Sequence, residues 1–149
     1  MLRVSAKVDY AVRALVVLAR VTPASMKGDQ LAAEQSIPFR FLEVTLSELR
    51  HAGLVGSRRG ADGGYWLVGD PSEVTVRDIV VAVEGSVADL RSLNGSGPRR
   101  SGDRATTAPE REATANVWIG AGEHLDDHLA TISLADLVAR AGASASAAS

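Results

Sequence analysis

The chain has 149 residues, of which 46% are hydrophobic, so it is long and apolar enough to bury one core. It contains no cysteine, which excludes disulfides, thiolate-held zinc, thiolate-held iron–sulfur clusters and cysteine nucleophiles from this sequence. The formal net charge is −2, and no segment approaches the roughly 20 apolar residues that span a bilayer. Since the first residues also lack the apolar run of a secretory signal, we expect a cytoplasmic protein that does not contact membranes.

Three helices are predicted in the first third of the chain. Apolar residues recur at helical spacing over 5–21, where Ser5 is a suitable N-cap. A short helix is predicted over 28–35, and a third runs from Pro38, suited to a first helical turn, to Ala52. Gly53 then fits the position just after the helix. The second and third helices, joined by a tight turn, form a helix-turn-helix arrangement.

A hairpin and a fourth helix follow. Residues 54–58 and 65–68 read as short strands, and the glycine-rich segment 59–64 between them has the composition of a hairpin turn. A hairpin directly after a helix-turn-helix is a wing. Thr75 opens the next predicted helix, over 76–84.

The last third of the chain predicts a loop and two more helices. Residues 86–108 are polar and glycine-rich, which is typical of a flexible loop. A long helix is expected over 109–131, followed by a short one over 134–141 that Ser133 can cap, and by a disordered Ala/Ser tail over 142–149. The long helix carries an apolar stripe that we assign to dimerisation: Val117, Trp118, Ala121, Leu125 and Leu129.

These elements predict a mainly α fold. We expect a winged helix-turn-helix DNA-binding domain over 1–85, a two-stranded β wing within it, the loop 86–108, and a C-terminal dimerisation helix with a short terminal helix over 109–141.

The third helix shows the chemistry expected of a helix that reads DNA. Its polar face carries guanidinium, carboxylate and hydroxyl groups, which are the groups that recognise base edges in a major groove. The alternative is an ordinary solvated face, but the preceding helix and the following wing favour recognition. The expected polar face is Arg40, Glu43, Ser47 and Arg50, and the expected buried stripe is Phe41, Leu42, Thr45, Leu46 and Leu49.

Two further groups of residues are candidates for DNA contact. In the wing, Arg58 and Arg59 adjoin Gly60, and arginine prefers a narrow minor groove. At the start of the first helix, Ser5, Lys7 and Tyr10 cluster where free N–H groups attract a phosphate. The alternatives are an incidental solvated hairpin, and a serine that only caps and a tyrosine that only packs.

The charge distribution agrees with this reading. Residues 1–70 hold 9 Lys and Arg against 7 Asp and Glu, whereas residues 71–149 hold 7 against 11. The asymmetry favours a front half that faces DNA.

No catalytic motif is present. There is no Ser/His/Asp grouping, no phosphate-binding loop and no dinucleotide fingerprint, so we do not expect an enzyme. His124 and His128 have the spacing of a helical metal site, but two ligands do not make a site, and a solvated helix face is the commoner explanation.

The combined motifs resemble the Rrf-two family of bacterial winged-helix transcriptional regulators. The segments that carry the resemblance are SAKVDYAVRAL, LAAEQSIPFRFLE, LRHAGLV, SRRGADGGYWL and VTVRDIVVAVEG, with a looser match from Trp118 to Val138. The resemblance implies a homodimer whose late helices pair, and two recognition helices on a near-palindromic operator. It also implies base contacts by Glu43 and by the variable position Arg40, a phosphate contact by Arg50, and a minor-groove contact by Arg59.

One departure from the family limits the signal that this chain can sense. Many relatives hold an iron–sulfur cluster through cysteines in the loop that corresponds to 90–104, and this sequence has none there. We therefore expect no cofactor, and three alternatives for the signal stay open: an unidentified small molecule, a partner protein, or no signal at all. Two other functions remain open: a winged-helix protein-interaction module, and a regulator that responds to a ligand or metal through His124 and His128.

Overall fold

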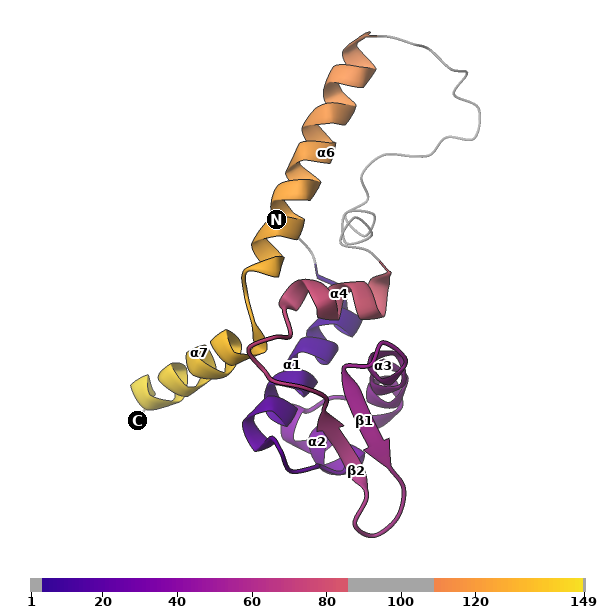
Figure 1. Ribbon diagram of the computed structural model, residues 1–149, viewed down its shortest axis with the longest axis vertical. Helices are drawn as coiled ribbons and strands as arrows, with labels where there is room; N and C mark the ends of the chain where they lie inside the picture. The colour runs from indigo at the N-terminus through magenta and orange to yellow at the C-terminus, as the bar shows by residue number, and fades with distance from the viewer. Residues whose placement is uncertain (1–3, 86–108, 149) are drawn as a thin grey trace.

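The computed structural model describes residues 4–85 and 109–148, with only the backbone described for 109–115. Figure 1 shows a small helical body with a projecting hairpin, and one long helix that stands away from that body. The predicted loop 86–108 lies outside the described residues. The elements are α1 (Ala6–Val21), α2 (Gly28–Gln35), α3 (Phe39–His51), β1 (Val55–Arg58), β2 (Gly64–Leu67), α4 (Val76–Glu84), α6 (Pro109–Ala130) and α7 (Leu134–Ala147).

The predicted fold class is confirmed. The described residues form a mainly helical fold with one two-stranded antiparallel sheet, and α2 and α4 have the predicted bounds. The remaining predicted elements before α7 agree to within one residue at each end. Helix α3 begins at Phe39 with Pro38 as its N-cap, so the proline lies just before the first turn and not inside it.

Polar side chains fix where several helices begin. Ser5 caps α1 by accepting a hydrogen bond from the Val8 amide, 3.2 Å away. Thr75 and Ser133 each form a capping box with an aspartate three residues later, which satisfies amide groups that have no partner inside the helix. These caps explain why the starts of α1, α4 and α7 could be predicted from sequence.

The hairpin is anchored along its second strand. β1 pairs with β2 in antiparallel register, with Ser57 opposite Tyr65. Tyr65 also exchanges two hydrogen bonds with Met26, each 2.8 Å long, so Met26 extends the base of the sheet on its other side. Gly64 has a positive φ of 147°, and a Cβ there would lie 2.7 Å from the Met26 carbonyl oxygen. Only glycine fits this close approach.

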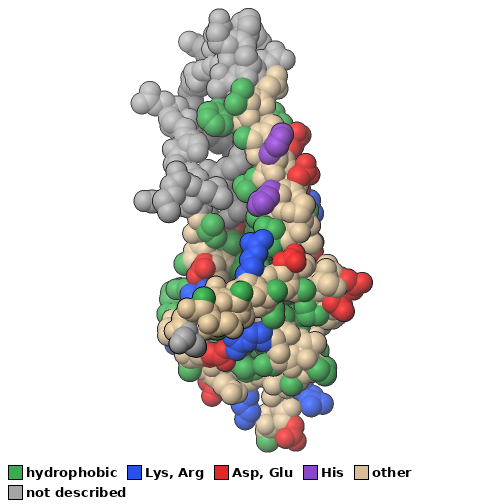
Figure 2. Space-filling model, turned by 90° about the vertical axis from the view of Figure 1, so that its left-hand side faces the viewer, with side chains coloured by type: hydrophobic (Ala, Val, Ile, Leu, Met, Phe, Trp, Pro, Cys, Tyr) green, Lys and Arg blue, Asp and Glu red, His purple; other side chains and the backbone are tan. Residues whose placement is uncertain are grey.

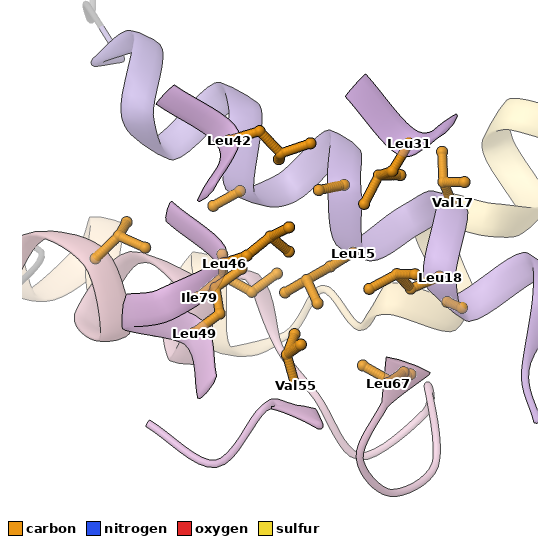
Figure 3. Close-up of a cluster of buried hydrophobic side chains, with 14 of the residues drawn as sticks. Leu15, Val17, Leu18, Leu31, Leu42, Leu46, Leu49, Val55, Leu67 and Ile79 are labelled. Carbon is orange, nitrogen blue, oxygen red and sulfur yellow. The ribbon is translucent and has the colours of Figure 1, made fainter. Parts of the chain in front are cut away.

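One hydrophobic core lies where α1, α3 and α4 meet the base of the hairpin, and it contains mainly aliphatic side chains (Figure 3). This agrees with an aromatic content of only 4%. Side chains with no exposed surface include Leu15, Leu18, Leu31, Leu42, Leu46, Leu49, Ile79 and Leu134.

The C-terminal helices are attached to this core and not merely appended to it. Leu134, the first residue of α7, has no exposed surface. The Val76 amide donates to the Ile132 carbonyl (2.9 Å), and the Leu134 amide donates to the Val74 carbonyl (2.8 Å). Arg77 of α4 pairs with Asp126 of α6 at 2.6 Å, and this carboxylate raises the pKa of Arg77 above its ordinary value.

The prediction for the C-terminal tail was wrong. Helix α7 continues to Ala147, whereas the sequence predicted a helix end at Ala141 and a disordered tail. The segment after Gly142 is Ala/Ser, and alanine has the highest helix propensity of all residues, so the helix continues although the side chains over 139–148 are exposed. Among the described residues, none of the helices combines the length and the apolar content needed to cross a bilayer.

Candidate nucleic-acid interface

Helix α3 presents its predicted polar edge to solvent. Arg40, Glu43 and Arg50 are exposed and Ser47 is half-buried, while the opposite face is buried through Leu42, Thr45, Leu46 and Leu49. Residues 40, 43, 47 and 50 lie three or four positions apart, so their side chains project from one side of the helix. Arg40 and Glu43 are therefore open to a groove, while the Arg50 end of this edge adjoins the hairpin.

Phe41 was predicted to be buried, and this prediction was wrong. Its side chain is 64% exposed, because position 41 lies about 100° around the helix from the core-facing Leu42. Val44 is also 58% exposed on the outer face, next to Arg40 and Glu43. Sequence reasoning missed Val44 because it looked only for polar groups. An exposed valine offers an apolar contact to a thymine methyl group, which is a recognised form of base readout.

The end of α3 is tied to the hairpin. The Arg50 guanidinium donates to the Ser57 hydroxyl on β1, 3.3 Å away. The His51 ring nitrogen Nδ1 lies 2.7 Å from the Ser47 carbonyl. These contacts place one arginine between the recognition helix and the wing, where it can reach a phosphate and fix the register of the protein on a duplex.

The wing carries its two arginines at its tip. Arg58 donates to the Asp62 carbonyl across the turn (3.2 Å), while Arg59 is exposed. Gly60 has a φ of +109°, and the Gly63 amide closes the turn by donating to the Gly60 carbonyl at 3.0 Å. The glycine at position 60 therefore makes a tight tip, from which Arg59 projects.

The start of α1 differs from its prediction in one respect. Ser5, Lys7 and Tyr10 do lie together on the first turns, but each already has a partner. The Ser5 hydroxyl donates to Glu84 at 2.5 Å while capping α1, and Lys7 pairs with Glu48 of α3 at 2.8 Å. Tyr10 is half-buried, with the Arg13 guanidinium 6.0 Å from the centre of its ring. Phosphate contacts by these residues stay a prediction.

The predicted dimerisation stripe on α6 divides into two parts. Leu125 and Leu129 are half-buried and pack against the core of their own chain. Val117 and Trp118 are 63% and 59% exposed, and Ala121 is also exposed. Ile119, at 53% exposure, was not predicted. Along α6, apolar side chains lie near exposed histidines (Figure 2). Of the predicted stripe, the part from 117 to 121 is the one that is exposed among the described residues.

The two histidines of α6 do not gather further ligands. His124 and His128 are exposed, and His124 Nδ1 donates to the Gly120 carbonyl at 2.9 Å. Within residues 4–85 and 109–148, no group of three or more His, Cys, Asp or Glu side chains is arranged to hold a metal ion. The chain also has no cysteine to bind an iron–sulfur cluster, so the residues present do not fit that cofactor.

A helix with an exposed polar edge, followed by a hairpin tipped with arginine, is the DNA-binding surface of a winged-helix protein. The chain belongs to the Rrf2 family, whose model, described as "Iron-dependent Transcriptional regulator", matches residues 4–140. It is a transcriptional regulator with a DNA-binding fold, and neither the relatives nor the fold are those of an enzyme.

Curated relatives extend over nearly the whole chain. A Mycobacterium tuberculosis (strain H37Rv) protein, named by class among the HTH-type transcriptional regulators, is 36% identical over 137 residues, which are 91% of this chain and 81% of the relative. The HTH-type transcriptional regulator IscR of Serratia proteamaculans is 34% identical over 141 residues, which are 92% of this chain and 79% of that protein.

A solved structure shows the same fold. The structure of CymR, the global cysteine regulator of B. subtilis, superposes with a TM-score of 0.71 at 28% identity, and the match covers 94% of this chain and 98% of that one. The fold prediction and the family resemblance are both confirmed.

Proposed function

We propose that this protein binds a near-palindromic operator as a homodimer, represses transcription from it, and does so without an iron–sulfur cluster. The observation that carries the proposal is the exposed edge of α3 beside the wing. That edge exposes Arg40, Glu43 and Arg50, so it carries both charge signs, and it lies next to an exposed arginine at a glycine turn.

The side chains of this surface divide into two roles. Arg40, Glu43 and Ser47 lie on the outer side of α3 and supply base contacts, because guanidinium, carboxylate and hydroxyl groups recognise different base edges. Arg50 and Arg58, held near the hairpin, supply phosphate contacts that set the register. Arg59 supplies the minor-groove contact.

The exposed apolar side chains of α6 support the proposed dimer. Val117 and Trp118 expose apolar surface on a helix that stands away from the body of the protein (Figure 1). Exposed apolar groups of this size mark interaction sites, and a second copy of the same helix would bury them. A twofold pair of recognition helices then requires an operator with twofold symmetry.

The signal must reach this protein by a route other than a thiolate-held cluster. The family description mentions iron, but this sequence offers no thiolate, and no other ligand group for a metal is assembled in the part of the chain that the structure describes. We propose a small ligand or a partner protein as the effector, with a regulator that senses no signal as the alternative.

The experiment is selection of bound duplexes from a random library, followed by binding measurements at fixed salt. We expect an enriched near-palindrome, and a Glu43→Ala variant that selects a more relaxed motif with a smaller loss of affinity. Absence of any enriched sequence would contradict the proposal and favour a protein-interaction module. An enriched motif that contains a single half-site would contradict the proposed dimer but not DNA binding.

A further inference from the structure

An ion pair joins the start of α1 to the flank of the recognition helix. Lys7 Nζ lies 2.8 Å from Glu48 Oε1, and the two side chains are 37% and 35% exposed. Glu48 Oε2 is buried and, among the described residues, has no hydrogen-bond partner. Among the described residues, Lys7 is therefore the partner of a carboxylate that is partly removed from water.

The pair lies at the rim of the candidate DNA-binding surface. Glu48 directly follows Ser47 on α3, and Phe41 lies on the same flank two turns earlier. Lys7 is in the first turn of α1, where the helix dipole disfavours a cation and favours a carboxylate. The Glu48 carboxylate thus stabilises a lysine at a position that is intrinsically poor for one.

We propose that Glu48 is a positioning residue that holds Lys7 back from the DNA backbone, so that Lys7 makes no phosphate contact in the natural protein. The inference rests on the proposed DNA-binding function and goes beyond it. Moving Lys7 to a phosphate would leave the half-buried Glu48 carboxylate without a counter-charge, and an ion whose partner is removed is costly when it is shielded from water. A phosphate contact by Lys7 would therefore have to contribute more free energy than the loss of the ion pair costs.

The test compares Lys7→Met, Glu48→Gln and the double variant. Each is titrated with the selected duplex and with an unrelated duplex over a series of salt concentrations. We expect Lys7→Met to leave affinity and salt dependence unchanged. Glu48→Gln should tighten binding to both duplexes by about three- to tenfold, and should steepen the slope of log K against log salt by about 0.9 per protomer, the value for one added phosphate contact.

The double variant separates a released lysine from simple repulsion between Glu48 and DNA. If Glu48→Gln acts by releasing Lys7, adding Lys7→Met should abolish the gain. A gain that persists in the double variant overturns the inference, and so does a Lys7→Met variant with a flatter slope, because Lys7 would then already contact a phosphate.

Two controls show whether a change in binding comes from the Lys7–Glu48 pair. Glu34→Gln removes the acid of a similar pair, Arg20–Glu34, at the other end of α1 (3.0 Å), and should change neither affinity nor slope. Thermal unfolding identifies a variant that fails to fold, in which case the slope of Lys7→Met decides. Equal affinity of the parent protein for both duplexes would contradict the proposed sequence specificity. A Glu48→Gln variant with unchanged affinity and salt dependence would contradict only the inference about the ion pair.

Discussion

At the scale of single residues, Arg59 has the least ambiguous position in the candidate interface. It is exposed at a tight glycine turn, while Arg58 donates back to the hairpin and Arg50 donates to Ser57. To contact DNA, Arg58 and Arg50 must break or share these hydrogen bonds, whereas Arg59 is exposed and makes none among the described residues. Arg59 should therefore contribute more to binding than its neighbours in the wing.

We predict that Arg59→Ala weakens operator binding by about 1–3 kcal/mol. The measurement is fluorescence anisotropy with the selected duplex at one salt concentration. Arg140→Ala, which makes the same charge change on the exposed part of α7, is the matched control and should bind as the parent does. Equal affinity of Arg59→Ala and the parent would remove Arg59 from the interface.

At the residue scale, sequence reasoning misplaced one apolar side chain and missed one tertiary contact. Phe41 was assigned to the core because its type is apolar, yet the helix geometry turns it outward. Lys7 was assigned to phosphate because of its charge, and that contact stays a prediction, but its ion pair with Glu48, 41 positions later in the chain, was not predicted. This ion pair leaves no signal in the local sequence, whereas the edge formed by Arg40, Glu43 and Arg50 follows from spacing alone.

At the scale of elements, caps decide where the helices begin. The Asp136 carboxylate accepts from the Ser133 amide at 2.9 Å, and its own amide donates to the Ser133 hydroxyl at 3.1 Å. These hydrogen bonds lower the pKa of Asp136 below its ordinary value of 3.8. The ionised form is therefore stabilised in the folded protein, and the benefit is present above that value and lost as the pH falls through the lower folded pKa.

We predict that Asp136→Asn lowers the urea midpoint of unfolding at pH 7, because the charged half of the capping box is lost. Asparagine does not titrate, so the gap between the variant and the parent should narrow once the pH falls below 3.8. Urea titrations followed by circular dichroism at several pH values measure this gap. If the difference in urea midpoint stays constant down to acid pH, the charge of the Asp136 carboxylate does not contribute to stability.

Helix α6 has two kinds of apolar residue, and they should respond differently to substitution. Leu125 and Leu129 pack against the core of their own chain, whereas Trp118 is 59% exposed. Large aromatic side chains commonly carry much of the binding energy at an interface. Trp118 is therefore the best single test of the proposed pairing of two chains.

We predict that Trp118→Ala raises the dimer dissociation constant by about tenfold or more, without lowering the thermal stability of the isolated chain. Sedimentation velocity over a range of concentrations measures the association. Val68→Ala alters another exposed apolar residue and should leave association unchanged. A parent protein that stays monomeric at high concentration would count against the dimer itself.

At the scale of the whole molecule, the first and last parts of the chain share one core. Leu134 is fully buried, and the backbone of 74–76 is hydrogen-bonded to that of 132–134. The sequence indicated a DNA-binding domain over 1–85 and a separate C-terminal part. Amphipathic spacing shows that a helix has an apolar face, but not what covers it, so the attachment of α7 could not be predicted.

We predict that Leu134→Ala lowers the free energy of unfolding by about 2–5 kcal/mol, since it removes a fully buried leucine and leaves a cavity. In a Trp118→Phe background, fluorescence reports Trp66 of the wing alone. The unfolding midpoint measured by Trp66 fluorescence should shift by the same amount as the midpoint measured by circular dichroism. Both are measured at one protein concentration. A shift in the circular dichroism alone would mean that α7 unfolds independently of the wing domain.

The pairing of strand β2 on both sides limits how far the hairpin can move. β2 pairs with β1 on one edge, as far as Arg58 opposite Gly64, and Tyr65 is hydrogen-bonded to Met26 on the other edge, so only the turn residues 59–63 lie beyond the paired strands. A turn this short can move only a small distance relative to the paired strands. The distance between the arginine tip and α3 is thereby almost constant, so the spacing of the major- and minor-groove contacts is built into each protomer before any duplex arrives.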